Sequence, residues 1–533
     1  MNPIRCQESS LLHLLLFCIL IFSSVHGRGS AGIIPQPQKY LSRAGTFTLT
    51  PETTYHTDTP LAKEAVSYLQ SHLQASSGYT LKASTSATLF FHYSRTTISE
   101  DEGYRLHITP KHITLTAKDR SGFFYGVITL LQLMPPTIWQ PHSHTTRWSL
   151  PACTIHDAPR FQWRGMMLDV SRNFFSVTYV KKFIDRMAQY KLNRFHWHLS
   201  DDEGWRIEIK RYPLLTQIGA KRGPGTQLPF STFPAMRGPK NKPQKGFYTQ
   251  AQIREIVAYA KARCIEILPE IDLPAHAKAA VTAYPDMLLD PHDTSHFRSV
   301  QKITGNTINP ARESTYTLFE GVLKEMASLF PFGYIHLGGD EVPKGAWSGS
   351  PSVKKLMHQK NLKSNKEVEN YFFSRMDRIA AKYGKHIAGW QEITEGRPAI
   401  RRSSLIIAWQ NPKAGKKIIQ KGYPTIMAPV QYLYFDQQYA RSKKEPGHTW
   451  STPISLHKVY SFTPPSQAQG MEACLWSETL LNAQLADYLT WPRALALSEI
   501  AWCTQKNWKD FKRRVKEKAL PRLKVQGVHY RKQ

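Results

Sequence analysis

No Asn-x-Ser/Thr acceptor for N-glycosylation occurs anywhere in the 533 residues. A eukaryotic secreted chain of this length would usually carry at least one such site on a surface loop. Long apolar runs are also missing after the N-terminal segment, since no later stretch has the roughly 18 uninterrupted apolar residues of a transmembrane helix. The sequence therefore favours a bacterial protein whose mature part has no transmembrane segment.

Cysteine is scarce and shows no paired spacing. Cys6 and Cys18 lie near the N-terminus, and the other four are far apart, with no CxxC pair: Cys153, Cys264, Cys474 and Cys503. This spacing excludes a disulfide scaffold and a zinc ribbon. We expect four free, mostly buried thiols, and a single bridge between two of them is the alternative.

Acidic residues are few beside basic ones. The chain has 70 Lys and Arg against 40 Asp and Glu, a formal net charge of +30. Such a charge attracts nucleic acid, anionic membranes or acidic glycans without specificity. No zinc finger, aromatic RNA-binding signature or basic heptad region is present. We therefore expect a solvated basic surface and no specific nucleic-acid partner, with a basic partner-binding face as the alternative.

The N-terminus has the pattern of an export signal. Arg5 is followed by an apolar run from Leu11 to Phe22, and small residues precede a candidate cleavage site after Gly27. This run has the length of a signal-peptide core and is short for a membrane span. We predict a signal peptide at 1–27 and an exported protein that is periplasmic, at the cell surface or secreted. An uncleaved anchor is the alternative.

The remaining length is enough for two domains, and 41% hydrophobic residues allow a large core. Within 32–157, residues 61–73 and 121–133 have helical periodicity, whereas 104–108 and 112–117 alternate like paired strands. We predict an α+β accessory domain at 32–157 and a larger catalytic domain at 158–533.

From residue 161 onward, short apolar strands alternate with amphipathic helices, a pattern typical of a parallel sheet. Helical patterns cover 178–191, 249–263, 315–329 and 366–383. Together with eight strands, they predict the α/β class and a closed (β/α)8 TIM barrel. The predicted strands are 165–170, 194–199, 265–270, 334–337, 386–390, 405–409, 425–429 and 471–476.

Polar and aromatic residues follow nearly every predicted strand. Barrel enzymes carry their chemistry at the carboxyl ends of the strands, so these residues are candidates for function. They are Asp169, Arg172, Asp201, Asp202, Asp272, His276, Asp340, Glu341, Trp390, Trp409, Tyr434, Asp436, Trp476 and Glu478.

Asp340 and Glu341 form the sharpest candidate pair. Gly338 and Gly339 precede them, and two glycines permit a tight bend and a close approach of ligand. Adjacent carboxyls repel, so we expect at least one disturbed pKa, as acid–base chemistry requires. An Asp-Glu pair is most often solvated surface, but a place behind a buried barrel strand favours function.

Single residues in this set have ordinary explanations. A lone His276 is more often a hydrogen-bonded core histidine, and any one Trp is as often core packing. Three Trp at the strand ends of one barrel instead indicate an aromatic-walled pocket, which suits sugars and acyl groups. The His and Asp residues could also ligate a metal, but no HExxH or complete zinc-ligand spacing is present, so we expect no metal.

Five runs and one N-terminal segment together resemble a known family. They occur in the family's order: Ile34 to Gln38, Arg164 to Arg172, His196 to Asp202, Glu270 to His276, His336 to Glu341 and Glu472 to Glu478. On these runs the chain resembles the glycoside hydrolase family 20 β-N-acetylhexosaminidases, and the segment before residue 158 resembles their accessory domain.

The resemblance implies an exo-acting enzyme that removes terminal non-reducing β-linked GlcNAc or GalNAc with retention. Members of this class let the substrate's own acetamido group attack, through an oxazolinium intermediate. Glu341 would then be the general acid/base, and Asp340 would orient and stabilise the acetamido group. Tyr434 would donate to the acetamido oxygen, and Asp201 and His276 would form a relay to Glu341.

The resemblance also implies the residues that hold the terminal sugar. The acetamido group would be enclosed by aromatic walls and the ring hydroxyls would be bound by charged groups. The walls are Trp390, Trp409 and Trp476, and the hydroxyl-binding residues are Arg164, Asp436 and Glu478.

Some points stay open. Ala275 stands where the family usually has Gly, and the Pro- and Lys-rich loop 221–245 is expected on the leaving-group side. The partners would be amino-sugar oligosaccharides or glycoconjugates, such as chitin fragments, peptidoglycan fragments or host glycans. Two rivals remain: a sugar-binding protein without catalysis, opposed by the presence of Glu341, and a metal-dependent barrel hydrolase.

Overall fold

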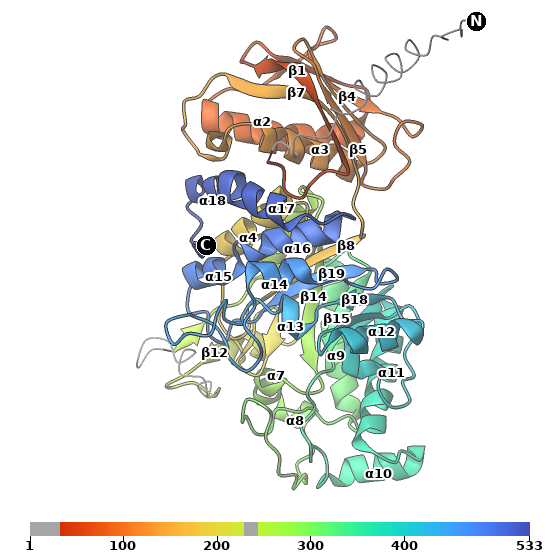
Figure 1. Cartoon of the computed structure of the whole chain (residues 1–533). Helices are drawn as coiled ribbons and strands as arrows, with labels where there is room; N and C mark the ends of the chain where they lie inside the picture. The colour runs from red at the N-terminus through yellow and green to blue at the C-terminus, as the bar shows by residue number, and fades with distance from the viewer. Residues whose placement is uncertain (1–31, 229–242, 533) are drawn as a thin grey trace, which may run out of the picture.

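The computed structural model describes residues 32–228 and 243–532. The predicted signal peptide, and 229–242 of the predicted leaving-group loop, lie outside the described residues. Among the helices that are described, none combines the length and apolarity needed to cross a bilayer. Figure 1 shows a smaller N-terminal domain resting on one end of a larger barrel domain.

The N-terminal domain is built on a mixed sheet of seven strands in the order β1-β7-β5-β6-β4-β2-β3. The predicted antiparallel pair is present, since Tyr104 faces Ala117 and Ile108 faces Ile113. The strands are β1 (Lys39–Leu49), β2 (Thr54–Thr57), β3 (Lys82–Ala83), β4 (Leu89–Tyr93), β5 (Tyr104–Ile108), β6 (Ile113–Ala117) and β7 (Trp148–Asp157).

Two helices, α2 (Lys63–Ser77) and α3 (Arg120–Leu133), pack together on this sheet. Asp119 caps α3 by accepting a hydrogen bond from the Gly122 amide, and such a cap satisfies one of the free amides at a helix start. At Gly126 a β-carbon would lie 2.2 Å from Leu115 of β6. The small residue therefore lets α3 approach the sheet closely, and both predicted helices are confirmed.

The larger domain is a closed barrel of eight parallel strands, as predicted. Its circular order is β14-β15-β16-β17-β18-β19-β8-β9, so each barrel strand lies beside the next barrel strand along the chain. The strands are β8 (Trp163–Asp169), β9 (Arg194–His198), β14 (Glu266–Leu273), β15 (Tyr334–Gly338), β16 (His386–Trp390), β17 (Leu405–Ala408), β18 (Thr425–Met427) and β19 (Gly470–Leu475).

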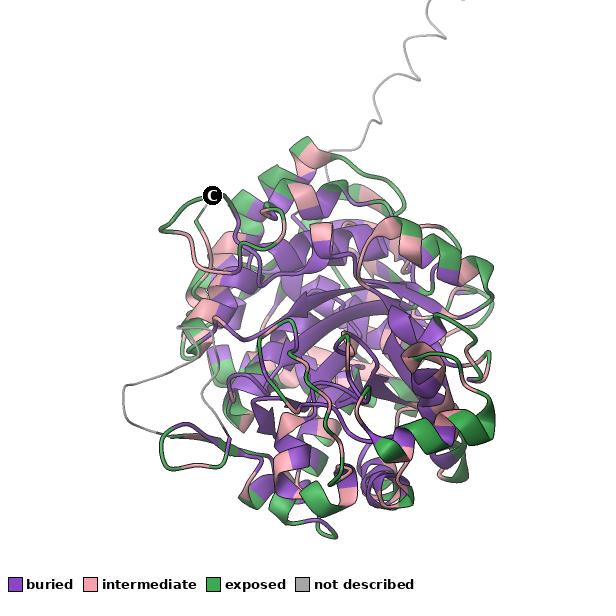
Figure 2. Ribbon diagram, turned by 90° about the horizontal axis from the view of Figure 1, so that it is seen from below, coloured by how far each residue is buried: buried purple, intermediate pink, exposed green. Residues whose placement is uncertain are grey.

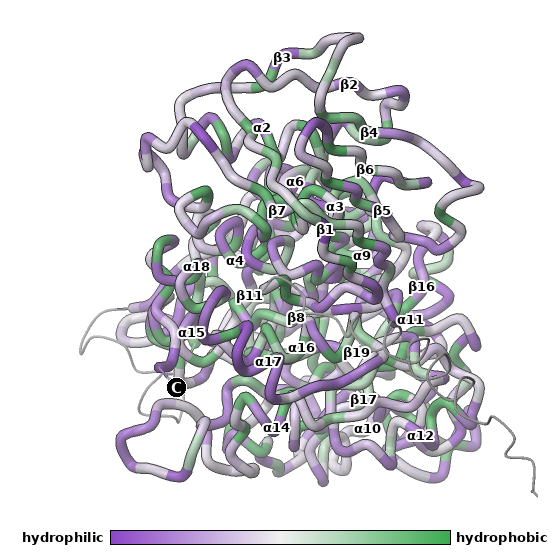
Figure 3. Tube along the Cα trace, turned by 45° about the horizontal axis from the view of Figure 1, so that its top comes forward, coloured by the Kyte–Doolittle hydropathy of each residue, from purple (hydrophilic) through white to green (hydrophobic). Residues whose placement is uncertain are grey.

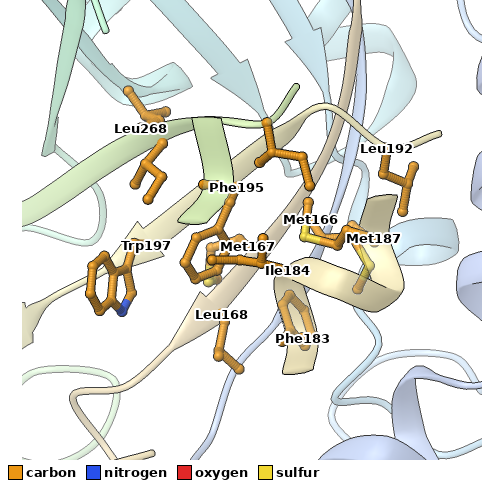
Figure 4. Close-up of a cluster of buried hydrophobic side chains, with 14 of the residues drawn as sticks. Met166, Met167, Leu168, Phe183, Ile184, Met187, Leu192, Phe195, Trp197 and Leu268 are labelled. Atoms are coloured by element: carbon orange, nitrogen blue, oxygen red, sulfur yellow. The ribbon is translucent and has the colours of Figure 1, made fainter. Parts of the chain in front are cut away.

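Alternation along β9 explains how the barrel wall is made. Phe195 and Trp197 belong to the apolar cluster that Figure 4 shows against α4 (Val177–Gln189), and the Phe195 ring lies 5.8 Å from that of Phe183. Successive strand residues face opposite sides, so His196 and His198 face the barrel interior. The strand thus buries apolar residues under the helices and polar residues inside the barrel.

Helices cover the outside of the barrel, and the strands they enclose are buried (Figure 2). Hydrophobic segments gather in the interior in Figure 3. Besides α4, the longer helices are α6 (Gln250–Lys261), α9 (Glu313–Leu329), α10 (Pro351–Lys360), α11 (Asn365–Lys382), α12 (Pro412–Gln420), α15 (Ala483–Thr490) and α16 (Arg493–Trp502).

Shorter elements decorate the ends of the strands. They are the small strands β10 (Ser200–Asp201), β11 (Gly204–Trp205), β12 (Lys221–Arg222) and β13 (Gln244–Lys245), and the short helices α5 (Leu214–Gln217), α7 (Lys278–Ala283), α8 (Pro285–Leu288), α13 (Val430–Leu433) and α14 (Leu456–Ser461).

The C-terminal helices α17 (Trp508–Arg514) and α18 (Leu520–Val525) join the two domains. Arg514 donates to the carbonyl of Ile33, and Arg522 donates to the carbonyl of Gln132 at the end of α3. The four described cysteines are free thiols, as favoured by their spacing.

Candidate active site

A cavity of about 410 Å³ opens at the carboxyl ends of the barrel strands. This is the end that barrel enzymes use for chemistry, and the volume suits a small ligand. Nine of the eleven site residues predicted from the sequence line it. The lining consists of Arg172, His276, Val300, Gln301, Asp340, Glu341, Trp390, Trp409, Tyr434, Asp436, His448, Trp450, Trp476 and Glu478.

The two glycines after β15 are required by the local geometry. Gly338 and Gly339 have φ values of +68° and +103°, which L-residues rarely adopt. A β-carbon on Gly338 would lie 1.7 Å from Asp272 Oδ1, and one on Gly339 would lie 2.1 Å from Ile393. The chain can therefore turn sharply beneath the pocket and present the next two side chains to it.

Asp340 and Glu341 emerge from this turn in different environments. Asp340 is buried, whereas the Glu341 side chain is 27% exposed. Burial raises the pKa of Asp340 to about 6, with Glu341 adding to the shift and His276 opposing it. The expected disturbed pKa therefore falls on Asp340. Glu341 itself has φ +50°, a strained backbone of the kind found at active sites.

His276 lies between Glu341 and a buried acid. Its Nε2 is 3.4 Å from Glu341 Oε2, and its Nδ1 is 3.1 Å from Asp201 Oδ1. Burial alone would lower the pKa of His276, but Asp201 and Asp340 outweigh it and raise that pKa well above its usual value. Asp201 does not line the pocket and stands directly behind His276, as a relay would require.

Aromatic rings form one side of the pocket. Trp390 and Trp476 lie 5.7 Å apart between ring centroids, and Trp409 stacks at 6.0 Å on Tyr434. Trp390 donates its indole N–H to Glu270, and Trp409 donates to Glu392. These hydrogen bonds fix the rings of Trp390 and Trp409, so the pocket has a rigid apolar wall that also includes the Tyr434 ring.

Charged groups form another part of the lining, and the Arg172 guanidinium lies 5.0 Å from the centre of the Trp476 ring. Burial raises the pKa of Asp436 to about 7, although nearby His448 opposes this shift. Burial also acts to raise the pKa of Glu478, but Arg172 and His448 lower it to about 2. An ionised Glu478, a readily protonated Asp436 and the Arg172 guanidinium together offer acceptors and donors for sugar hydroxyls.

The prediction for Arg164 is wrong in its location. Arg164 lies near the start of β8 and is fully buried, where it pairs with Glu102 at 2.7 Å. It also donates to the carbonyls of Lys191 and Phe161. Arg172, three residues beyond the end of β8, lines the pocket instead. A side chain at the start of a strand cannot reach a ligand at its carboxyl end.

Four further pocket residues were not predicted. Val300 and Gln301 come from the long segment after α8, and His448 and Trp450 come from the segment before α14. Val300 and Trp450 are 65% and 58% exposed, which places them at the rim. They lie in segments without strand or helix periodicity, so no sequence pattern marked them.

Several of the buried groups could in principle bind a metal ion. In the described part of the chain, four sets of three acidic or imidazole side chains bring candidate ligand atoms within 4.8 Å of one another. Each set contains at least one imidazole–carboxylate contact between its own members, as between His276 and Asp201. The geometry therefore accommodates the predicted relay, and a chelator experiment separates it from the metal-dependent rival.

Paired carboxylates facing an aromatic wall at the carboxyl end of a barrel define a carbohydrate-cleaving site. Comparison with family models gives the family. The catalytic domain of glycosyl hydrolase family 20 matches residues 161–505, and domain 2 of the same family matches residues 30–158. The chain belongs to glycosyl hydrolase family 20, and it is a glycoside hydrolase, as predicted.

Similar proteins support this assignment. A β-hexosaminidase of Vibrio furnissii is 35% identical over 87% of this chain and 76% of its own length. A β-hexosaminidase of Porphyromonas gingivalis is 33% identical over 93% of this chain, which spans 64% of that relative. The crystal structure of a GH20 exo-β-N-acetylglucosaminidase from Vibrio harveyi with N-acetylglucosamine has TM-score 0.88 and 36% identity, covering 94% of this chain and 78% of that one.

Proposed function

We propose that this protein is an exo-acting β-N-acetylhexosaminidase that uses the substrate's 2-acetamido group as its nucleophile. The observation that carries the proposal is the position of Asp340. It is a buried carboxyl directly before Glu341, and both line one pocket with four Trp and Tyr434. An acyl group enclosed by such a wall would lie against Asp340, where a developing positive charge on its nitrogen finds a partner.

In the first step, the acetamido carbonyl oxygen attacks the anomeric carbon while the glycosidic bond breaks. Glu341 donates its proton to the departing oxygen, and the product is a bicyclic oxazolinium ion with its positive charge beside ionised Asp340. The aromatic wall holds the acetamido oxygen near the anomeric carbon, so attack is intramolecular in effect. Tyr434 donates a hydrogen bond to that oxygen and keeps it in line.

In the second step, Glu341 as a carboxylate takes a proton from water, and the water oxygen attacks the anomeric carbon. The oxazolinium ring opens and the amide re-forms. Two displacements at one carbon give net retention of the β configuration. The positively charged His276, held by Asp201, lies beside Glu341 through both steps and orients the acid.

The charged residues of the pocket lining select the sugar. Arg172, Asp436 and Glu478 converge on the space next to the reacting centre and would bind the ring hydroxyls of a terminal residue. The names of similar proteins support this choice, since one relative, from Vibrio harveyi, is an N,N′-diacetylchitobiase. We propose terminal β-linked GlcNAc or GalNAc of oligosaccharides or glycoconjugates as substrates, processed outside the cytoplasm after export through the N-terminal signal.

The decisive experiment compares aryl β-glycosides of N-acetylglucosamine and glucose, which differ in the acetamido group. We expect rapid hydrolysis of the first and barely any of the second. Product NMR should show the β anomer first, and a thiazoline analogue of the bicyclic intermediate should bind more tightly than substrate because it resembles the transition state. Anomeric inversion, or a covalent sugar–carboxylate adduct on the protein, would rule the mechanism out.

A further inference from the structure

A row of buried acids and imidazoles runs through the barrel core to the catalytic pocket. Its members alternate between carboxylate and imidazole, and all but the last are buried. Barrel interiors are ordinarily filled by branched aliphatic side chains, and buried charges are costly unless each is paired. The row comprises Glu270, His198, Asp201, His276 and Glu341, and outside it His196 lies between Glu270 and Glu472.

The pocket end of the row depends on the orientation of Asp201. Oδ1 of Asp201 faces His276, and Oδ2 faces away from it. His198 Nε2 lies 3.0 Å from that second oxygen, and Arg172 Nη2 lies 2.6 Å from it. Asp201 is therefore held from two sides: by Arg172, which lines the pocket, and by His198, which lies in the core.

Glu270 on β14 holds the core side of this arrangement. Its Oε2 accepts a hydrogen bond from His198 Nδ1, and its Oε1 accepts one from the Trp390 indole at 3.0 Å. One carboxylate thus contacts both the wall of the pocket and the relay toward Glu341. His196 and His336 also lie within 3.0 Å of the Glu270 oxygens, so polar contacts to both oxygens hold this carboxylate in one orientation.

Neighbouring groups of opposite charge favour the charged forms of His198 and Asp201. Burial would lower the pKa of His198, but the charge of Glu270 outweighs burial and raises that pKa well above its usual value. The hydrogen bond to Asp201 and the charge of Asp169 raise it further. His198 is therefore an imidazolium that donates at both nitrogens. Burial opposes ionisation of Asp201, yet Arg172 and His276 hold the pKa of Asp201 well below its usual range.

We propose that Glu270 and His198 are positioning residues for the acid step, acting on Glu341 through Asp201 and His276. Glu270 holds His198 with its Nε2 proton aimed at Asp201, Asp201 then presents its other oxygen to His276, and His276 faces Glu341. The inference rests on the proposed function, because it assigns these two residues to the proton donation by Glu341. Neither residue lines the pocket, so neither touches substrate.

The test uses Glu270→Gln and His198→Gln with a series of aryl N-acetylglucosaminides of differing leaving-group acidity. Gln at 270 still accepts from Trp390 but cannot stabilise an imidazolium at 198, and Gln at 198 keeps one amide near Asp201. A poor leaving group needs protonation to depart, whereas an acidic phenol does not. We expect a loss of roughly tenfold to a hundredfold for poor leaving groups and little loss for the most acidic ones.

Glu472→Gln is the matched control. Glu472 is equally buried and contacts His196, but it touches neither His198 nor Asp201. We expect this variant to keep the wild-type dependence on leaving group, whatever it does to stability. Rates are divided by the concentration of active sites, which is titrated with the thiazoline inhibitor. Partial unfolding of a preparation lowers the rate on every substrate by the same factor, so it does not change the dependence on leaving group.

A double-mutant cycle tests whether His198 acts on Glu341 through His276. If His198 acts through His276, then His198→Gln in a His276→Ala background should not steepen the leaving-group dependence further. In the unmodified protein, histidine-labelled NMR should show His198 doubly protonated over the active pH range, a measurement that needs no variant to fold.

The outcomes separate this inference from the proposed function. If Glu341→Gln steepens the leaving-group dependence but Glu270→Gln and His198→Gln do not, the positioning role is overturned and the proposed function stands. A steepening of equal size in Glu472→Gln, or a neutral His198 in the wild type, overturns the positioning role as well. If wild type does not cleave the N-acetylglucosaminides, the proposed function itself fails.

Discussion

His276 and Glu341 face each other with Nε2 and Oε2 3.4 Å apart, and both have positive φ, +52° and +50°. A non-glycine residue in this region costs on the order of 1 to 3 kcal/mol and persists only where its surroundings hold it. The turn after β14 and the two glycines after β15 thus bring an imidazole and a carboxyl together from neighbouring strands.

Glu341→Gln should remove acid catalysis, because an amide cannot donate the proton that Glu341 gives to the departing oxygen. We expect a loss on the order of a hundredfold or more for poor leaving groups and a smaller loss for highly acidic ones. Steady-state rates on a series of aryl glycosides measure this. An equal loss on every substrate would point to misfolding or to a different acid.

The pH profile should report Asp340. Burial raises the pKa of Asp340 to about 6, so this carboxyl is ionised above that pH and protonated below it. The oxazolinium charge needs the ionised form, and kcat/KM should therefore fall as pH drops through about 6. Asp340→Asn should lower the rate at neutral pH and abolish this acid limb. An unchanged limb in Asp340→Asn would assign it to another group.

Much of this site could be predicted because strand ends are easy to find in a sequence. Asp340, Trp390 and Trp476 each stand at the end of an apolar run, and parallel strands bring their carboxyl ends to one face. The pattern of strand ends in the sequence is therefore enough to identify most of the residues that line the pocket.

The failures have a physical reason as well. Arg164 and Arg172 occur in one motif, but a seven-residue strand is roughly 20 Å long, so its two ends serve different parts of the molecule. Trp450 and His448 come from an irregular segment, and only tertiary packing brings them over the pocket. The relay through Glu270 is equally hidden, since its members are far apart in the chain.

Gly338→Ala should be much more harmful than Gly384→Ala. The two glycines have φ of +68° and +69°, but a β-carbon would lie 1.7 Å from Asp272 Oδ1 at Gly338 and would meet nothing within 4 Å at Gly384. Backbone strain alone costs about 1 kcal/mol, and overpacking adds roughly 1 to 3 kcal/mol. Denaturant unfolding gives the difference, and kcat should fall only in Gly338→Ala. Equal destabilisation would mean that the turn relaxes freely.

Activity should survive metal removal, because the proposed chemistry needs only carboxylates and the substrate's amide. Enzyme treated with excess chelator and then desalted should keep its full rate on an aryl N-acetylglucosaminide. Added Zn²⁺ should not increase it. Activity that is lost on chelation and restored by Zn²⁺ would instead favour a metal among the His and Asp residues behind the pocket.

The two arginines of the β8 motif should differ in their effect on substrate binding. Lys in place of Arg keeps the charge but loses the planar fork that makes several hydrogen bonds. Arg172→Lys should raise KM, because Arg172 lines the pocket, and it should also lower stability, because buried Arg172 pairs with Asp169, Asp201 and Glu203. Arg164→Lys should leave KM unchanged but cost about 1 to 3 kcal/mol of stability, because buried Arg164 bonds Glu102 and the Phe161 carbonyl. Steady-state kinetics and denaturant unfolding on both variants measure this. A raised KM in Arg164→Lys with unchanged stability would reverse the assignment and return Arg164 to the sugar.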